Sequence, residues 1–136
     1  MQFDTKIAVV LRDDLAGWQA TNATAFLVSG IAASVPGVVG EPYADASGNE
    51  YQPMFVQPVL IYGADTPGLR RAYERAMSRG VRPAVYTREL FETSHDEANR
   101  AAVASVASED LDLVGIAFRA ERKTVDKIVD RLRFHP

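Results

Sequence analysis

The chain has 136 residues, a length that accommodates one domain and leaves too few residues for a second core. Its proportions of hydrophobic residues (47%) and charged residues (24%) are typical of a globular protein. The absence of cysteine excludes disulfides, a thiol nucleophile and thiolate metal ligands. The net charge of -3 argues against nucleic-acid binding over a broad surface, because phosphate contacts need a basic field.

We expect a cytoplasmic protein without a membrane segment. The first residues include Asp4 where a signal peptide needs a basic region. The longest uncharged segment, residues 15–40, is long enough to span a bilayer, but Gln19 and Asn22 interrupt it and Pro36 ends its helical part. This segment is therefore predicted to be a helix buried within the protein.

The chain begins with a predicted strand and a long helix. Residues 6–11 form an apolar run expected of an interior strand, and Asp14 is expected to cap a helix over residues 15–35. One stripe of this helix is predicted to pack on a sheet: Ala20, Ala23, Thr24, Leu27, Val28 and Ile31. A second stripe lies opposite: Trp18, Asn22, Ala25 and Ser29. Two such stripes leave little surface for water, so we expect the helix to be central or to meet a partner, and we expect a homodimer.

A long loop and a second strand follow. Residues 37–53 are rich in Gly, Pro, Asp, Asn and Ser, and residues 45–49 predict a tight turn. Long loops of this kind are often functional, although an exposed excursion explains the composition equally well. The β-branched segment 54–62 predicts a strand, in which Pro58 indicates an edge position or a bulge.

The second half of the chain continues the alternation of helices and strands. Thr66 before Pro67 is typical of a helix start, and Gly80 is well placed to end that helix in a left-handed conformation. The remaining predicted elements are a strand at 81–86, a helix from Thr93 or Ser94 to about 107, a strand at 113–118, and a helix with the stripe Val125, Ile128, Val129 and Leu132.

This order predicts a single α/β domain over residues 1–136. Alternating strands and helices favour helical crossovers, with helices covering both faces of a sheet. The expected architecture has three layers, α/β/α, around a four-stranded, mostly parallel (mixed) sheet. One edge strand of that sheet can still run antiparallel.

Both ends of the chain resemble the peptidyl-tRNA hydrolase II family. Residues 6–15 form a strand that ends in Arg-Asp-Asp-Leu before an alanine-rich helix, and the family's first strand ends in Arg-x-Asp-Leu. Residues 113–118, followed by the helix through residues 125–129, are similar to the family's last strand and closing helix. The resemblance implies a peptidyl-tRNA hydrolase II-like fold.

A closer resemblance is to the DUF2000 family, which shares that fold and has no known function. It is carried by Leu15, Trp18-Gln19, Asn22-Ala23, Ala25 and Asp45-Ala46-Ser47-Gly48-Asn49. The resemblance covers essentially the whole chain. It implies a fold and almost nothing about activity.

Comparison with the hydrolase family implies that its catalytic groups are changed here. The family's Gly-Lys-x-Ala-Ala-Gln run, whose lysine is implicated in catalysis, corresponds to residues 17–22. Trp18 therefore stands in place of the lysine, and an indole cannot carry the charge or transfer a proton as an ammonium does. The family's acid after the third strand corresponds to Thr87, although Glu89 lies close enough to restore a carboxylate.

Trp18 and Asn22 lie one helical turn apart and form the main candidate ligand site. An indole platform beside an amide suits a small polar ligand, whereas packing under the loop explains the same residues structurally. Arg12, Asp13 and Asp14 stand where a strand meets a helix, the place where α/β proteins bind ligands, although an ion pair and a helix cap also explain them. The candidate ligand-binding residues are Trp18, Asn22, Arg12, Asp13, Asp45, Asn49 and Thr87.

Other patterns point to no metal and no cofactor. His95 and His135 stand far apart without surrounding ligand residues, and the glycines form neither a P-loop nor a dinucleotide motif. Arginine is concentrated around the second helix, which suits either an anion or a solvated face: Arg70, Arg71, Arg75, Arg79 and Arg82.

Three functions remain open from the sequence. The leading expectation is a domain that binds a small polar ligand near Trp18, Asn22 and the 45–49 loop without the catalytic lysine. The second is a hydrolase of an ester or amide, with Asp13, Thr87 or Glu89 as acid or base. The third is a homo-oligomeric interaction module.

Overall fold

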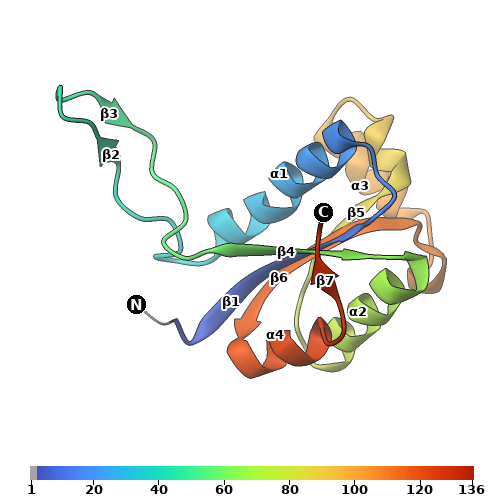
Figure 1. Ribbon diagram of the computed structural model, residues 1–136. Helices are drawn as coiled ribbons and strands as arrows, with labels where there is room; N and C mark the ends of the chain where they lie inside the picture. The colour runs from blue at the N-terminus through green and yellow to red at the C-terminus, as the bar shows by residue number, and fades with distance from the viewer. Residues whose placement is uncertain (1–2) are drawn as a thin grey trace.

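The computed structural model describes residues 3–136, and these contain a five-stranded mixed sheet with helices on both faces (Figure 1). The sheet is formed by β1 (Thr5–Arg12), β4 (Val59–Ala64), β5 (Ala84–Thr87), β6 (Leu113–Glu121) and β7 (Arg133–Phe134). The helices are α1 (Gly17–Ser34), α2 (Thr66–Ser78), η1 (Arg88–Phe91), α3 (Asp96–Ala104), η2 (Ser108–Asp110) and α4 (Arg122–Ile128). A separate hairpin consists of β2 (Tyr43–Ala44) and β3 (Glu50–Tyr51).

The central strand β1 is buried on both faces, as its continuous apolar run predicts. Ile7, Val9 and Leu11 face one layer, in which α1 packs, while Ala8 and Val10 face the layer that contains α2 and α4. All five are at most 1% exposed. The α/β class with helices on both faces is thus confirmed.

The sheet differs from the expected one in strand number and direction. The order is β5-β6-β1-β4-β7, and only β1 and β4 pair in parallel among these strands of residues 3–136. The prediction of four mostly parallel strands was therefore wrong. The reason is that β6 inserts antiparallel between β1 and β5, so the helix before β6 is an excursion between neighbouring strands rather than a crossover.

The unexpected strand β7 arises from the end of the chain. The last helix stops at Ile128, earlier than its stripe predicts, and Arg131 adopts a left-handed φ of 71° that redirects the backbone. Phe134 then stacks on Tyr62 of β4, with the ring centroids 5.1 Å apart. A two-residue strand of this kind has too few residues to show an alternating pattern.

Helix α1 buries the stripe that the sequence predicts. Ala23, Leu27 and Ile31 are buried against the sheet, while Trp18 of the opposite stripe is 62% exposed. The helix is therefore not central in the single chain, and its second stripe faces solvent.

The helix caps differ from the expected residues. Asp14 does not cap α1: Gln19 instead accepts a hydrogen bond from the Ala16 N–H. Asp65, rather than Thr66, caps α2 by accepting from the Gly68 N–H at 2.8 Å. His95, rather than Thr93 or Ser94, caps α3 through its Nδ1. The N-cap positions of the three helices, Ala16, Asp65 and His95, lie within two residues of the predicted ones. Gly80 ends the α2 segment with φ +70°, as predicted.

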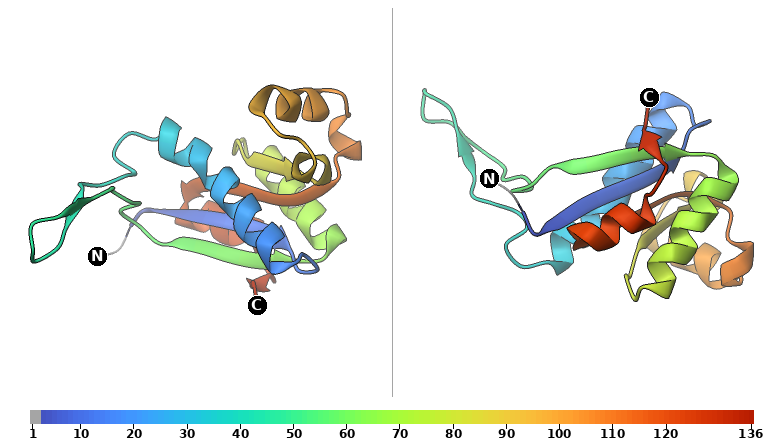
Figure 2. Two further views of the ribbon diagram at one scale, coloured as in Figure 1. Left: turned by 90° about the horizontal axis from the view of Figure 1, so that it is seen from above. Right: turned by 60° about the horizontal axis from the view of Figure 1, so that its bottom comes forward.

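Residues 54–58, expected to begin the second strand, lie outside β4. The chain first forms an isolated bridge between Val39 and Phe55 and enters the sheet at Val59. Pro58 thus precedes the strand. Its missing N–H therefore costs the sheet no hydrogen bond, and no bulge is needed. The loop before it is extended into the β2–β3 hairpin, which projects from the body (Figure 2).

Candidate functional site

Three strands end at one edge of the sheet, and the side chains at this edge come from separate parts of the sequence. Strands β1, β4 and β5 run in the same direction, because β6 is antiparallel to both β1 and β5. Their last residues are Arg12, Ala64 and Thr87. In open α/β sheets, ligands bind beyond the carboxyl ends of the strands.

The charged residues at this edge are bound to one another. The Arg12 guanidinium donates to both carboxylate oxygens of Asp14, at 3.0 and 2.6 Å. Asp112 accepts ion pairs from Arg12 at 3.7 Å and from Arg88 at 3.4 Å. The hydrogen bond from Arg12 lowers the pKa of Asp14, and the same bond raises the pKa of Arg12. The geometry therefore gives Arg12 and Asp14 an ion-pair role.

Asp13 follows β1 and Thr87 ends β5, and these two strands are not neighbours in the sheet. The backbone N–H of Asp13 donates to the Ala64 carbonyl at 2.9 Å, and its Cβ approaches Gly63 of β4. Thr87 is 2% exposed at the end of β5, with β6 between β5 and β1. Two strand spacings amount to about 10 Å. The structure therefore does not bring Asp13 and Thr87 into one acid–base pair.

An aromatic cluster joins α1 to β5 and η1. The Trp18 ring meets Phe91 edge-on at 5.5 Å, Phe91 lies 5.0 Å from Tyr86, and Tyr86 lies 6.1 Å from Phe26. Asn22 Nδ2 donates to the Tyr86 hydroxyl at 3.1 Å, and that hydroxyl donates to the Leu90 carbonyl at 3.3 Å. Burial raises the pKa of Tyr86, which keeps its hydroxyl protonated at neutral pH. Trp18 and Asn22 thus belong to one surface, as their spacing predicts.

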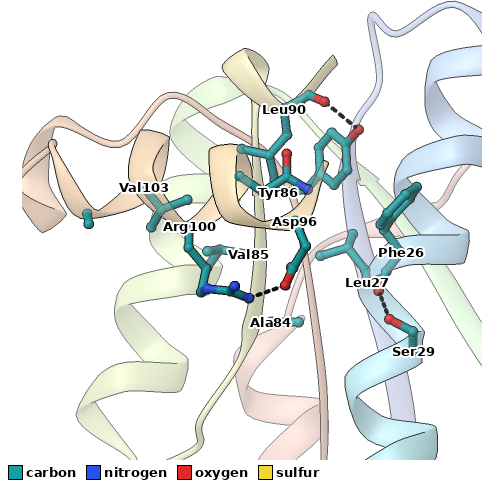
Figure 3. A pocket seen from close by; sticks show the side chains of 12 residues that line it. Phe26, Leu27, Ser29, Ala84, Val85, Tyr86, Leu90, Asp96, Arg100 and Val103 are labelled. Atoms are coloured by element: carbon teal, nitrogen blue, oxygen red, sulfur yellow. Dashed lines mark hydrogen bonds and ion pairs between the residues drawn. The ribbon is translucent and has the colours of Figure 1, made fainter. Parts of the chain in front are cut away.

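A groove of about 530 Å³ opens beside this cluster, between α1, β5 and α3 (Figure 3). Phe26, Leu27, Tyr86 and Val103 line its apolar wall. The rim carries the Asp96–Arg100 ion pair, which both residues form on α3. An apolar groove with a few polar groups at the rim has the character of a small-molecule site.

The contribution of α3 to this groove was missed in the sequence. Its residues Asp96, Arg100 and Val103 have ordinary helical spacing and carry no motif. Only the packing of α3 beside β5 brings them to Phe26, 70 or more positions earlier in the chain. No local signal in the sequence marks them as neighbours of α1.

The predicted ligand residues Asp45 and Asn49 lie in the hairpin, beyond the far end of α1 from Trp18 (Figure 1). Asp45 accepts hydrogen bonds from the backbone N–H groups of Ser47 and Asn49 at 2.9 and 3.0 Å, and from the Tyr51 hydroxyl at 2.6 Å. These bonds, with the Tyr51 hydroxyl as the largest contributor, lower the pKa of Asp45 to about 2. Both residues therefore build the turn, and one chain does not bring them to Trp18.

No lysine of the chain lies near Trp18. The three lysines of the chain are Lys6, Lys123 and Lys127. Lys6 lies near the start of β1, at the opposite edge of the sheet, and the other two lie on α4, which packs on the opposite face from α1. None of the three lysine side chains therefore lies beside Trp18.

The arginines of α2 separate into different environments. Arg70 donates to the carbonyls of Ser108 and Leu111 and lies 5.3 Å above the Tyr73 ring, so it fastens η2 to α2. Arg75 and Arg79 instead line a groove between α2 and α4. Among residues 3–136, no group of three or more His, Asp or Glu side chains is arranged to hold a metal ion. Within the same residues, no helix is long and apolar enough to cross a membrane.

The family model described as "Protein of unknown function (DUF2000)" matches residues 5–136. The chain belongs to the DUF2000 family. A solved protein of unknown function from Agrobacterium tumefaciens strain C58 is 45% identical, covers 99% of this chain with 100% of its own, and gives a TM-score of 0.96. No curated protein matches the chain. Neither the family description nor the name of the solved relative gives an activity.

Proposed function

We propose that this DUF2000 protein binds a small ligand in the groove beside Trp18 and Asn22, on a peptidyl-tRNA hydrolase II-like fold that lacks the catalytic lysine. The ligand has a flat apolar part and a polar group. The observation that carries the proposal is the open groove of about 530 Å³ adjoining the aromatic cluster of α1 and β5.

The chemistry of the groove supports binding rather than turnover. Phe26 is 56% exposed and Leu27 and Val103 supply an apolar wall, so a flat ligand gains by covering this surface. Arg100 and Asp96 at the rim offer a donor and an acceptor to its polar group. The Tyr86 hydroxyl is already bonded to Asn22 and Leu90, which leaves it an orienting rather than a proton-transferring role.

Blocking the groove tests the binding proposal. Ser29 is exposed and lines the groove, so Ser29→Phe fills it without disturbing the core. A fragment set of aromatic amides and carboxylates is titrated while the emission of Trp18, the single tryptophan, and backbone NMR shifts are followed. We expect fragments to shift α1 and α3 resonances in the wild type, and Ser29→Phe to raise their Kd about 10-fold or more.

The matched control is Ser34→Phe, which changes an exposed serine on the same helix outside the groove. Both serines donate to a carbonyl of their own helix, so the two changes remove similar bonds. Ser34→Phe should leave the Kd unchanged. Equal weakening by both changes, or fragment shifts located elsewhere in the wild type, would exclude this groove.

The hydrolase alternative is tested by turnover. Asp13 and Thr87 lie on separate sides of β6, and Glu89 follows Thr87 in η1. We therefore expect no cleavage of peptidyl-tRNA by the wild type or by Asp13→Ala. The variant Trp18→Lys, which places an amine at the position of the family's lysine, is assayed beside them. Wild-type cleavage abolished in Asp13→Ala would favour the hydrolase.

We further propose that the protein is a cytoplasmic homodimer. The second stripe of α1 supports self-association, because Trp18 is 62% exposed and Asn22, Ala25 and Ser29 are exposed as well. An exposed tryptophan on a helix surface is typical of a contact surface.

A further inference from the structure

The β2–β3 hairpin is the most exposed part of the molecule. We call residues 40–55 the arm; it carries no buried residue, and every residue from 41 to 52 is exposed. Figures 1 and 2 show it projecting away from the sheet and helices. Its exposed apolar residues are Tyr43 (49% exposed), Tyr51 (53%) and Met54 (59%).

The arm has a defined conformation in spite of this exposure. Its strands pair Tyr43 with Tyr51 and Ala44 with Glu50, and the Gly40 N–H donates to the Met54 carbonyl at its base. Asp45 closes the turn, in which Gly48 has φ +86°. A two-stranded hairpin is marginally stable in water without further packing. An arm built in this way gains stability when another surface covers it.

The arm also has the same placement in the solved relative. The arm is about an eighth of the chain, and a TM-score of 0.96 over 99% of the chain leaves no room for a segment of that size to be displaced far. The projection is therefore shared by two proteins of 45% identity. A shared, unsupported arm indicates a contact outside its own chain.

The charge of the arm indicates what covers it. Its charged residues are Glu41, Asp45 and Glu50, with no lysine or arginine. These three acids equal the whole net charge of -3, so the remainder of the chain is neutral overall. The arm is thus a localised acidic element, and its counterpart is a basic surface.

Such a surface exists on the body of the same chain. The groove between α2 and α4 has a volume of about 560 Å³ and is lined by Arg75, Arg79, Lys123 and Lys127. The groove also contains Asp126 and Asp130, but Asp126 is paired with Lys6. The four cations therefore outnumber the one free acid.

The groove opens at the edge of the sheet from which the arm projects. Strand β6 ends at Glu121, opposite the start of β1, and α4 begins directly after it. The arm returns to the sheet at the same edge, where Val59 begins β4 beside Ile7. Two copies related by a twofold axis at this edge can place each arm on the other copy's groove. Such reciprocal contacts are the common arrangement of homodimers.

We propose that the arm of one copy lies in the α2–α4 groove of a second copy, and that the second arm makes the reciprocal contact. This inference rests on the proposed self-association and places its contact on the arm and the α2–α4 groove instead of on the second stripe of α1. Glu41 and Glu50 face the lysines of α4 in the partner, while Tyr43 and Met54 lose their exposure to water.

Charge reversal on each side tests the contact. The arm variant carries Glu41→Lys and Glu50→Lys, and the groove variant carries Lys123→Glu and Lys127→Glu. Light scattering coupled to gel filtration at about 100 µM should give a dimeric mass for the wild type and a monomeric mass for each variant, because like charges then face each other. The dimer Kd should rise about 10-fold or more in both variants.

Mixing the two variants gives the decisive outcome. An arm-reversed copy and a groove-reversed copy together offer two opposite-charge contacts, so the mixture should form a heterodimer although neither variant forms a homodimer. The matched control carries Glu92→Lys and Glu109→Lys, which reverse two exposed acids outside the arm and should leave the dimer intact. Circular dichroism verifies that all variants are folded.

The results separate this proposal from the proposed self-association. A monomeric wild type overturns both. A dimer that survives arm reversal overturns the arm contact and leaves self-association through α1 in place. A mixture that remains monomeric shows that the arm does not bind in the α2–α4 groove.

Discussion

Polar residues in the predicted site regions are bonded to one another or to the backbone of this protein. Asp45 accepts bonds from Ser47, Asn49 and Tyr51, and Asp14 accepts two bonds from Arg12. Among residues 3–136, no buried polar side-chain atom lacks a hydrogen-bond partner. The aromatic cluster around Trp18 is different. The rings of Trp18 and Phe26 contact their neighbours, yet more than half of each side chain's surface stays exposed to solvent.

Asp45 gives a pH-dependent prediction at this scale. Its pKa is about 2, below the ordinary value of 3.8, so the carboxylate stabilises the arm turn above about pH 4 and this contribution is lost as the pH falls toward 2. Carboxyl ¹³C NMR should show this titration. Tyr51→Phe should raise the pKa toward 3.8, because the Tyr51 hydroxyl is the largest cause of the shift.

Tyr43→Phe is the control for that measurement. Tyr43 faces Tyr51 across the hairpin, but its hydroxyl does not bond to Asp45. The change should leave the pKa of Asp45 at about 2. A wild-type Asp45 that titrates near its ordinary value would show that the turn does not hold the carboxylate as described.

At the scale of elements, Gly115 of β6 lies under side chains of β1 and α1 that leave no room for a methyl group. A Cβ at this position would lie 2.8 Å from Leu11 Cδ2, 3.0 Å from Leu27 Cδ1 and 3.3 Å from the Val10 carbonyl oxygen. Two of these neighbours are fully packed core side chains. A larger residue at this position would therefore have to displace Leu11 of β1 or Leu27 of α1.

Two glycine substitutions should act in opposite directions. Gly115→Ala should lower the free energy of unfolding by about 1–3 kcal/mol, because the methyl group overpacks the α1–β6 contact. Gly30→Ala, on the exposed side of α1 with nothing within 4 Å of the new Cβ, should raise it by about 0.5–1 kcal/mol through helix propensity. Urea denaturation measures both.

Those two results check each other. A neutral Gly115→Ala would mean that α1 can shift away from β6 at little cost. A destabilising Gly30→Ala would mean that this side of α1 is covered by a partner, which would support a dimer through the helix rather than through the arm.

In the whole molecule, the strand order decides which residues share a site. Strand β6 between β1 and β5 separates Asp13 from Thr87 and thereby divides the expected hydrolase residues. The same order leaves β5 at the edge of the sheet, where α3 packs beside it and completes the groove with Phe26. The arm lies at the opposite end of α1, so the predicted site around residues 45–49 and Trp18 is split in two.

The sequence by itself determined the elements that depend on local pattern. The apolar run of residues 6–11, the stripe through Leu27 and the left-handed Gly80 are visible because hydrophobic period and φ preference act over a few neighbouring residues. The Trp18–Asn22 pair was predictable for the same reason, since one helical turn separates the two.

Only the tertiary structure decided how those elements are paired. The direction of β6, the short strand β7 and the position of α3 across the groove from α1 depend on contacts between residues that are far apart in the chain. An apolar strand carries the same pattern whichever neighbour it has. The tertiary structure also decided which residue caps each helix. Several polar side chains lie near the starts of α2 and α3, and only the backbone conformation shows which one reaches a free N–H group. The projecting arm is the clearest case: a Gly- and Pro-rich composition predicts a loop, but only the fold shows that the loop leaves the body.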